Sequence, residues 1–124
     1  PDTLYANWTK LDAATSLLQL VYSGKILKAT TNKFLLETLY ATTTGPLRLK
    51  GQLPEGTAVA HKTGTAGEDN KGVTAAVNDI GIVTLPNGNH LIICVFVRNS
   101  KEAFDTNEKI IADISYAAWL YFKH

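Results

Sequence analysis

The sequence predicts an α+β fold, in which an antiparallel sheet is packed by a C-terminal helix. Three observations carry this prediction: two helical apolar patterns within residues 1–45, a hairpin signal between two apolar runs, and a long apolar helical stripe at the end of the chain. A helix with one apolar face needs a second layer to cover, and residues 46–124 supply both a sheet and such a helix. We see no internal repeat and no domain boundary, so we expect residues 1–124 to belong to a single domain, with a helical part over residues 1–45 and the strands and closing helix over residues 46–124.

Two helices are expected before the sheet. Apolar residues recur at helical spacing over residues 11–22, and Gly24 stands where a C-terminal cap residue is common. Residues 9–12, Thr-Lys-Leu-Asp, resemble a capping box with Asp in place of Glu, which predicts the start of this helix. A second helix is expected from near Thr31 until a segment rich in threonine and glycine stops it.

Three antiparallel strands are expected next. The first contains the apolar run Ala58-Val59-Ala60, and the other two span residues 74–85 and 90–98. The segment Pro86-Asn87-Gly88-Asn89 between them is a strong hairpin signal. The run from Leu91 to Val97 would leave a long apolar edge, which folded proteins avoid. We therefore expect further strands from a missing N-terminal segment to complete the sheet.

The closing helix is the clearest element of the sequence. Asp105 and Glu108 are placed to cap its start. Its apolar residues form one continuous stripe at helical spacing, which we expect to face the sheet. The stripe consists of Ile110, Ile111, Ile114, Ala117, Ala118 and Tyr121. Trp119 and Tyr121 are expected to be core residues and not a platform for a ligand.

Composition excludes several classes of function. Twelve basic and 11 acidic residues give a net charge of +1, so neither nucleic acid nor an anionic membrane is expected as a partner. No apolar run approaches membrane-spanning length, and the polar start Pro1-Asp2-Thr3 is not a signal peptide. Because the chain contains no methionine, we expect a processed product or an internal piece. The single cysteine, Cys94, lies in an apolar run and is expected to be a buried small hydrophobe.

No cofactor and no metal are expected. His61, His90 and His124 have neither the spacing nor the carboxylate companions of a metal site. The glycines of residues 64–67, followed by Lys71, suggest a phosphate loop. They lack the Gly-Lys-Ser/Thr ending and the following helix that such a loop needs.

The five residues from His61 to Thr65 carry the most chemical information in the chain. They close the apolar run of the first strand, so they are expected at its end. Lys62 supplies a positive charge and three donors, while Thr63 and Thr65 supply hydroxyl donors. Gly64 has no Cβ, so a bound molecule can lie against the main chain. This set of groups suits a small ligand that carries a carboxylate. His61 is expected to be a packed or solvent-facing residue and not a catalyst.

Four segments together resemble the C-terminal part of a class A serine β-lactamase, nearest to the PER-like branch. They are Thr43-Thr44-Gly45-Pro46-Leu47-Arg48, Leu53-Pro54-Glu55-Gly56-Thr57, Val59-Ala60-His61-Lys62-Thr63-Gly64-Thr65 and Val77-Asn78-Asp79-Ile80-Gly81. The family has Ser-x-x-Lys, Ser-Asp-Asn and Lys-Thr-Gly elements. The resemblance covers nearly the whole chain. It implies that the first two helices belong to the family's all-α region, that the parent protein hydrolyses β-lactams through a serine acyl-enzyme, and that it is periplasmic.

The resemblance also implies roles for single residues. Lys62 would hold a positive potential in the cleft and attract the carboxylate of the β-lactam. Thr63 and Thr65 would hydrogen-bond that carboxylate, and Gly64 would let the substrate approach the strand. The backbone N–H of Thr65 would be one half of the oxyanion hole.

Arg48 departs from the commonest family pattern. Many members place an arginine on the strand after Lys-Thr-Gly to assist carboxylate binding, but the matching position here is Val77. In some members an arginine between helix and strand fills the same space, and Arg48 stands where that substitute would be. The alternative is a solvated surface arginine, and at the level of sequence both stay open.

The reactive half of the family's site is absent from the sequence. No serine is followed by lysine three residues later, no Ser-x-Asn occurs, and no Glu stands four residues before an Asn. Asn7 and Thr9 resemble the closing end of the Ω-loop that carries the deacylating Glu, so the chain is expected to begin inside that loop. Tyr5-Ala6-Asn7 matches the Tyr-x-Asn of a related hydrolase class only by coincidence. Nucleophile and deacylating Glu would lie upstream, and the chain alone is not expected to turn over β-lactams.

Two other functions stay open. One is a penicillin-binding transpeptidase or carboxypeptidase, which shares Lys-Thr-Gly and the acyl-enzyme step but deacylates slowly. The other is a non-catalytic truncated module that keeps the fold and binds a ligand. The segment around Arg48 and the end of the Ω-loop favour the lactamase.

Overall fold

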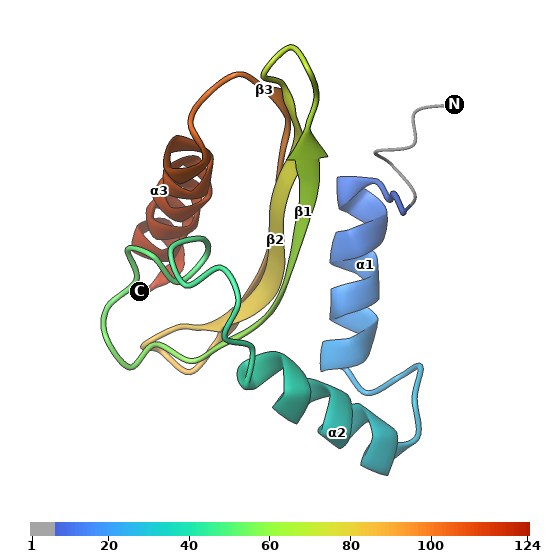
Figure 1. The fold of residues 1–124 in the computed structure, drawn as a ribbon. Helices are drawn as coiled ribbons and strands as arrows, with labels where there is room; N and C mark the ends of the chain where they lie inside the picture. Colours follow the sequence, from blue (N-terminus) through green and yellow to red (C-terminus); the bar gives the residue numbers. More distant parts are fainter. Residues whose placement is uncertain (1–6) are drawn as a thin grey trace.

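The computed structural model describes residues 7–124 and confirms the α+β architecture (Figure 1). The polar start Pro1-Asp2-Thr3 and the Tyr5 of the Tyr-x-Asn triplet lie outside the described residues. The elements in chain order are α1 (Leu11–Tyr22), α2 (Ala29–Tyr40), β1 (Val59–Glu68), β2 (Thr74–Thr84), β3 (His90–Ser100) and α3 (Phe104–Phe122). The three strands form one antiparallel sheet in the order β1-β2-β3. Helix α3 covers one face of this sheet and α1 covers the other (Figure 1).

Helix α1 forms where the apolar spacing predicts it, but it begins differently. The predicted capping box is wrong: the N-cap residue is Lys10, and no side chain caps the helix. The Thr9 hydroxyl donates instead to the Lys10 carbonyl, 3.3 Å away, and Asp12 accepts from the next amide at 2.9 Å. These local bonds compete with the cap. The helix ends as predicted, because Gly24 follows it with a φ of 68°.

Strand β1 is longer than the apolar run predicted. It continues to Glu68, so Lys62 and its neighbours lie within the strand and not at its end. The reason is pairing: every residue of β1 from Val59 to Ala66 faces a partner on β2. Backbone hydrogen bonds and burial against the neighbouring strand outweigh the weak strand preference of glycine and lysine.

The hairpin between β2 and β3 is confirmed. The amide of Leu85 donates to the carbonyl of Asn89 at 2.8 Å, and Gly88 has a φ of 83°. The outer edge of β3 pairs with no strand among the described residues. Cys94 on β3 is half-buried under α1, where the Thr15 hydroxyl donates to its sulfur at 3.5 Å. Burial raises the pKa of this thiol.

Asp69 holds the turn between β1 and β2. Its carboxylate accepts hydrogen bonds from the amides of Val73, at 2.9 Å, and Lys71, at 2.8 Å, and these bonds lower the pKa of Asp69 below its ordinary value of 3.8. A lowered pKa stabilises the folded state above pH 3.8, and this contribution is lost as the pH falls through the pKa of the folded state. We expect Asp69→Asn to destabilise the protein above pH 3.8 and to become neutral in stronger acid, measured by urea unfolding across this range. A difference that does not change with pH would contradict this expectation.

Helix α3 turns a different face to the sheet than the stripe predicted. Ile111 is fully buried as expected, but Ile110, Ile114 and Tyr121 are 37%, 45% and 78% exposed. The buried side chains are Asn107, Glu108, Ile111, Ala112, Ser115 and Trp119. The helix is apolar on two faces, and the rotation that buries Trp119 also turns Glu108 inward, where it meets Arg48. Glu108 therefore does not cap the helix; the N-cap residue is Ala103, without a side-chain bond.

The core lies between the sheet and α3. It contains Leu49, Val59, Val77, Val83, Leu85, Ile93, Val95, Ile111 and Trp119. The other helices leave apolar side chains open, among them Leu17 on α1 at 53% and Phe34 on α2 at 70% exposure. Within residues 7–124, no helix is both long and apolar enough to cross a membrane.

Candidate functional site

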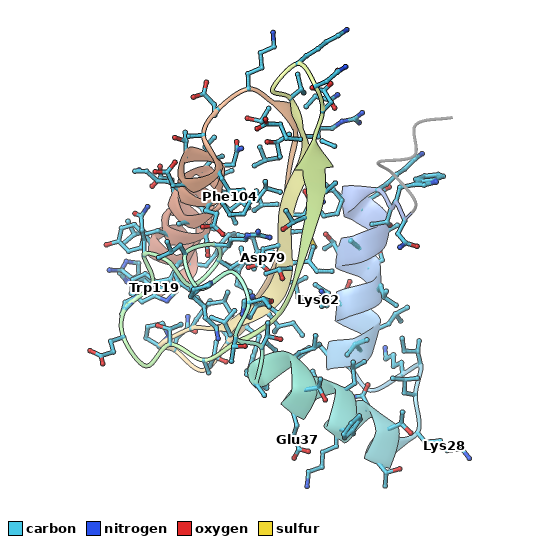
Figure 2. The ribbon with its side chains drawn as sticks, in the orientation of Figure 1. Lys28, Glu37, Lys62, Asp79, Phe104 and Trp119 are labelled. Carbon is cyan, nitrogen blue, oxygen red and sulfur yellow. The ribbon has the colours of Figure 1, made fainter. Side chains whose placement is uncertain are left out.

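The Lys-Thr-Gly residues lie on β1, an outer strand of the sheet, and their side chains alternate between its two faces. Lys62 pairs across the sheet with Ile80 and then Cys94, whose sulfur contacts α1, so this row faces α1. Thr63 pairs with Asp79 and then Val95, a core residue under α3. Figure 2 shows Lys62 and Asp79 on these two sides. The Lys62 ammonium therefore lies on the face of the sheet that turns to α1, and the hydroxyls of Thr63 and Thr65 lie on the face that turns to α3.

Arg48 is buried, so the alternative of a solvated surface arginine is wrong. It is 3% exposed, and its Nε donates to Glu108 Oε1 on α3 at 3.0 Å. Nη1 donates to the carbonyls of Gly64, at 3.0 Å, and Asn78, at 2.8 Å. Nη2 donates to the Thr65 hydroxyl at 2.8 Å. These bonds use four of the five N–H groups of a guanidinium and leave one on Nη2.

The segment before Arg48 crosses the outer side of β1 and holds it. The Thr42 hydroxyl donates to the His61 carbonyl at 2.7 Å, and the hydroxyls of Thr44 and Thr63 share a hydrogen bond of 2.7 Å. The Thr63 hydroxyl is therefore oriented by its neighbour at the edge of the strand.

Gly45 permits this close approach. Its φ is 58°, and a Cβ on it would lie 2.6 Å from Thr63 Cγ2 and 2.9 Å from Arg48 Cδ. We expect Gly45→Ala to lower the free energy of unfolding by about 2–5 kcal/mol, from backbone strain and overpacking together. Gly56→Ala is the matched control, because Gly56 has a φ of 80° and open space around it; this change should cost only about 1–2 kcal/mol. Equal losses in denaturant unfolding would contradict the steric part of the expectation.

The main chain of Thr65 faces outward from the sheet. Ala58 is in a hydrogen-bonded pair with Thr84, whose amide donates to its carbonyl at 2.9 Å. Because such pairs alternate along antiparallel strands, Lys62 and Gly64 also bond to β2, while the amide of Thr65 turns to the outer edge. The carbonyl of His61 accepts from the Thr42 hydroxyl, so the main chain of His61 also faces outward. This agrees with an outward Thr65, because the two residues are an even number of positions apart on the strand.

Lys62 lies exposed on β1, where its Nζ donates to the Thr63 carbonyl at 2.5 Å. Two hollows among the described residues lie elsewhere: one lies over α2 beside Asn32, and the other lies beside His90 and the C-terminal residues. Neither is lined by Lys62 or Thr65. Within residues 7–124, no three side chains of the metal-ligating types lie close enough to hold an ion.

His61 is packed inside the protein. Of the two environments expected for it, packed or solvent-facing, the first is therefore confirmed. His61 is 1% exposed, and its Nδ1 lies 3.0 Å from both carboxylate oxygens of Asp79, which is fully buried. Asp79 Oδ2 also accepts the amide of Leu49 at 3.2 Å. His61 Nε2 is buried and has no hydrogen-bond partner among the described residues.

Sequence reasoning missed two residues of this region. It assigned Glu108 to the cap of α3, and it quoted Asp79 without a role. Each had a usable signal: Glu108 lies one helical turn before the buried Ile111, and Asp79 alternates with the inward Val77. A carboxylate on an inward face needs a partner, which points to Arg48 and to His61.

The sequence matches the Beta-lactamase enzyme family over residues 4–122, and the chain belongs to that family. Its relatives include VEB-1 and PER-1, as the predicted class A, PER-like resemblance implied, and a solved class A β-lactamase of Bacteroides cellulosilyticus that is 36% identical. The chain is 48% identical over 98% of its length to β-lactamase VEB-1 of Pseudomonas aeruginosa, and 46% identical over 94% to the extended-spectrum β-lactamase PER-1 of the same organism. The solved structure of the extended-spectrum β-lactamase TLA-3 is 54% identical and superposes with a TM-score of 0.96 over 99% of the chain. The chain spans 41%, 38% and 45% of VEB-1, PER-1 and TLA-3, respectively.

Proposed function

We propose that this chain is the C-terminal portion of a serine β-lactamase that hydrolyses the β-lactam ring through an acyl-enzyme. The observation that carries the proposal is the arrangement at the edge of β1. There the Arg48 guanidinium holds the Thr65 hydroxyl at 2.8 Å, beside an outward Thr65 amide and the exposed Lys62. Two cations, two hydroxyls and an amide donor at one strand edge suit a substrate that carries both a carboxylate and a reacting carbonyl.

Each group has a proposed task. Lys62, together with the unused Nη2–H of Arg48, attracts the substrate carboxylate, and the hydroxyls of Thr63 and Thr65 hydrogen-bond it. Gly64, between them, leaves room for the substrate to lie against the strand. The Thr65 amide donates to the oxygen of the tetrahedral intermediate, where loss of one donor costs about 10²–10³ in kcat. No metal or cofactor takes part in this scheme.

The nucleophile and the deacylating Glu are proposed to lie in an N-terminal portion of the same protein. None of the serines Ser16, Ser23, Ser100 and Ser115 is followed by lysine three residues later. Apolar side chains are exposed on all three helices, and the outer edge of β3 pairs with no strand within residues 7–124. Both observations are further support, because a missing portion would cover these surfaces. Alone, the chain is proposed to be inactive, and the complete protein is proposed to be periplasmic.

Turnover of a chromogenic cephalosporin by the complete protein tests the proposal. Multiple fast turnovers are expected, together with a serine acyl adduct that forms and decays. A stable adduct without turnover would overturn the hydrolase and support a penicillin-binding transpeptidase. Neither turnover nor adduct would leave a non-catalytic module.

A further inference from the structure

A buried carboxylate joins the two segments that carry the cations of the proposed site. Asp79 lies on β2, and it accepts from His61 Nδ1 at 3.0 Å and from the Leu49 amide at 3.2 Å. Asp79 and His61 are 0% and 1% exposed, so neither bond competes with water. His61 directly precedes Lys62, and Leu49 directly follows Arg48.

The imidazole acts as a donor in this contact. Its Nε2 has no partner among the described residues, and a proton there would be a buried donor without an acceptor. The proton therefore resides on Nδ1, where the carboxylate accepts it. Asp79 thus receives one bond from a side chain of β1 and one from the main chain of the Arg48 segment.

We infer that Asp79 is a positioning residue that sets the spacing between Lys62 and Arg48. The inference rests on the proposed function, since these two cations must meet one carboxylate. A displacement of about 1 Å in a binding group can cost about 100-fold in rate. Among the described residues, Asp79 is bonded to His61 and to the Leu49 amide and not to the Arg48 guanidinium, so it acts through the backbone that it holds.

Kinetics of the complete protein test the inference. Asp79→Ala removes both acceptors and is expected to raise KM by about 10- to 100-fold, with a smaller effect on kcat. Val83→Ala is the control, because Val83 is a fully buried residue of the same strand outside the network. It should reduce stability without raising KM. If Asp79→Ala raises KM no more than Val83→Ala does, the inference is overturned.

Two changes at His61 separate the hydrogen bond from packing. The amide nitrogen of an asparagine can occupy the place of Nδ1 and donate to Asp79, so His61→Asn is expected to keep a KM near that of the native enzyme. His61→Leu retains apolar volume but loses the donor, and KM should rise as it does for Asp79→Ala. Equal KM values for the two variants would overturn the role of the bond.

Hydrogen exchange gives a readout that does not depend on catalysis. In the complete protein, Asp79→Ala should lower the protection of the Leu49 amide relative to Val83→Ala, and unchanged protection would overturn the network. If the native protein shows no turnover but this protection is lost, the proposed function fails while the network stands. Turnover by the native protein with unchanged KM and protection in Asp79→Ala means that the inference alone fails.

Discussion

Replacing Arg48 with alanine is expected to lower the free energy of unfolding by about 3–5 kcal/mol, because Glu108 is left as an unpaired buried charge. The same change should raise KM for penicillins, since it removes a charge from the proposed carboxylate site and releases the Thr65 hydroxyl. The stacking of the guanidinium over Phe104, 5.6 Å from the ring centroid, is lost as well. Denaturant unfolding and steady-state kinetics of the complete protein measure the two effects.

A double substitution separates stability from binding. Arg48→Met with Glu108→Leu removes both charges and retains apolar volume, so most of the lost stability should return. KM should remain high, because no cation has been restored. An unchanged KM in Arg48→Ala would contradict the role of Arg48 in substrate binding, and its bonds would then be structural only.

Replacing Lys62 with alanine is expected to reduce kcat/KM by about 10- to 150-fold, which is the loss of one charged hydrogen bond of about 1.5–3 kcal/mol. Stability should change by less than about 0.5 kcal/mol, because the Lys62 side chain is exposed on β1. Steady-state turnover of a chromogenic cephalosporin by the complete protein, with unfolding measured in parallel, checks both values.

The control for Lys62 is another exposed lysine. Lys71 lies in the turn after β1, away from the proposed site, and Lys71→Ala removes the same charge from the surface. It should leave kcat/KM unchanged if the effect of Lys62 is local. A similar loss in both variants would instead indicate a general effect of net charge on the approach of an anionic substrate.

Much of the fold could be predicted because it depends on local patterns. The hairpin at residues 86–89 needs glycine at a positive φ, and Gly88 provides it. Helix α1 needs apolar residues every three or four positions, and it buries those at Ala14, Leu18 and Val21. Its capping box failed because a short polar side chain has several local partners of similar energy, and the sequence does not rank them.

In the candidate site, too, some features follow from the local sequence and others depend on distant parts of the chain. Lysine, hydroxyls and glycine within residues 62–65 indicated a carboxylate ligand from chemistry alone, and the family that this motif suggested is confirmed. The roles given to these residues stay predictions. The place of the motif inside β1 and the burial of Arg48 could not be predicted, because both depend on partners far away in the chain.

The sequence by itself determined the α+β class, the family, and the functional groups that the Lys-Thr-Gly segment can present, because these depend on residue types and short spacings. Only the tertiary structure decided which face of α3 is buried and which carboxylates lie under the site. Glu108 meets Arg48 across 60 residues, and Asp79 meets His61 across 18, so no local pattern encodes either contact. The physical reason is that a buried charge has to find an opposite charge or a hydrogen-bond donor, and packing determines which one lies within reach.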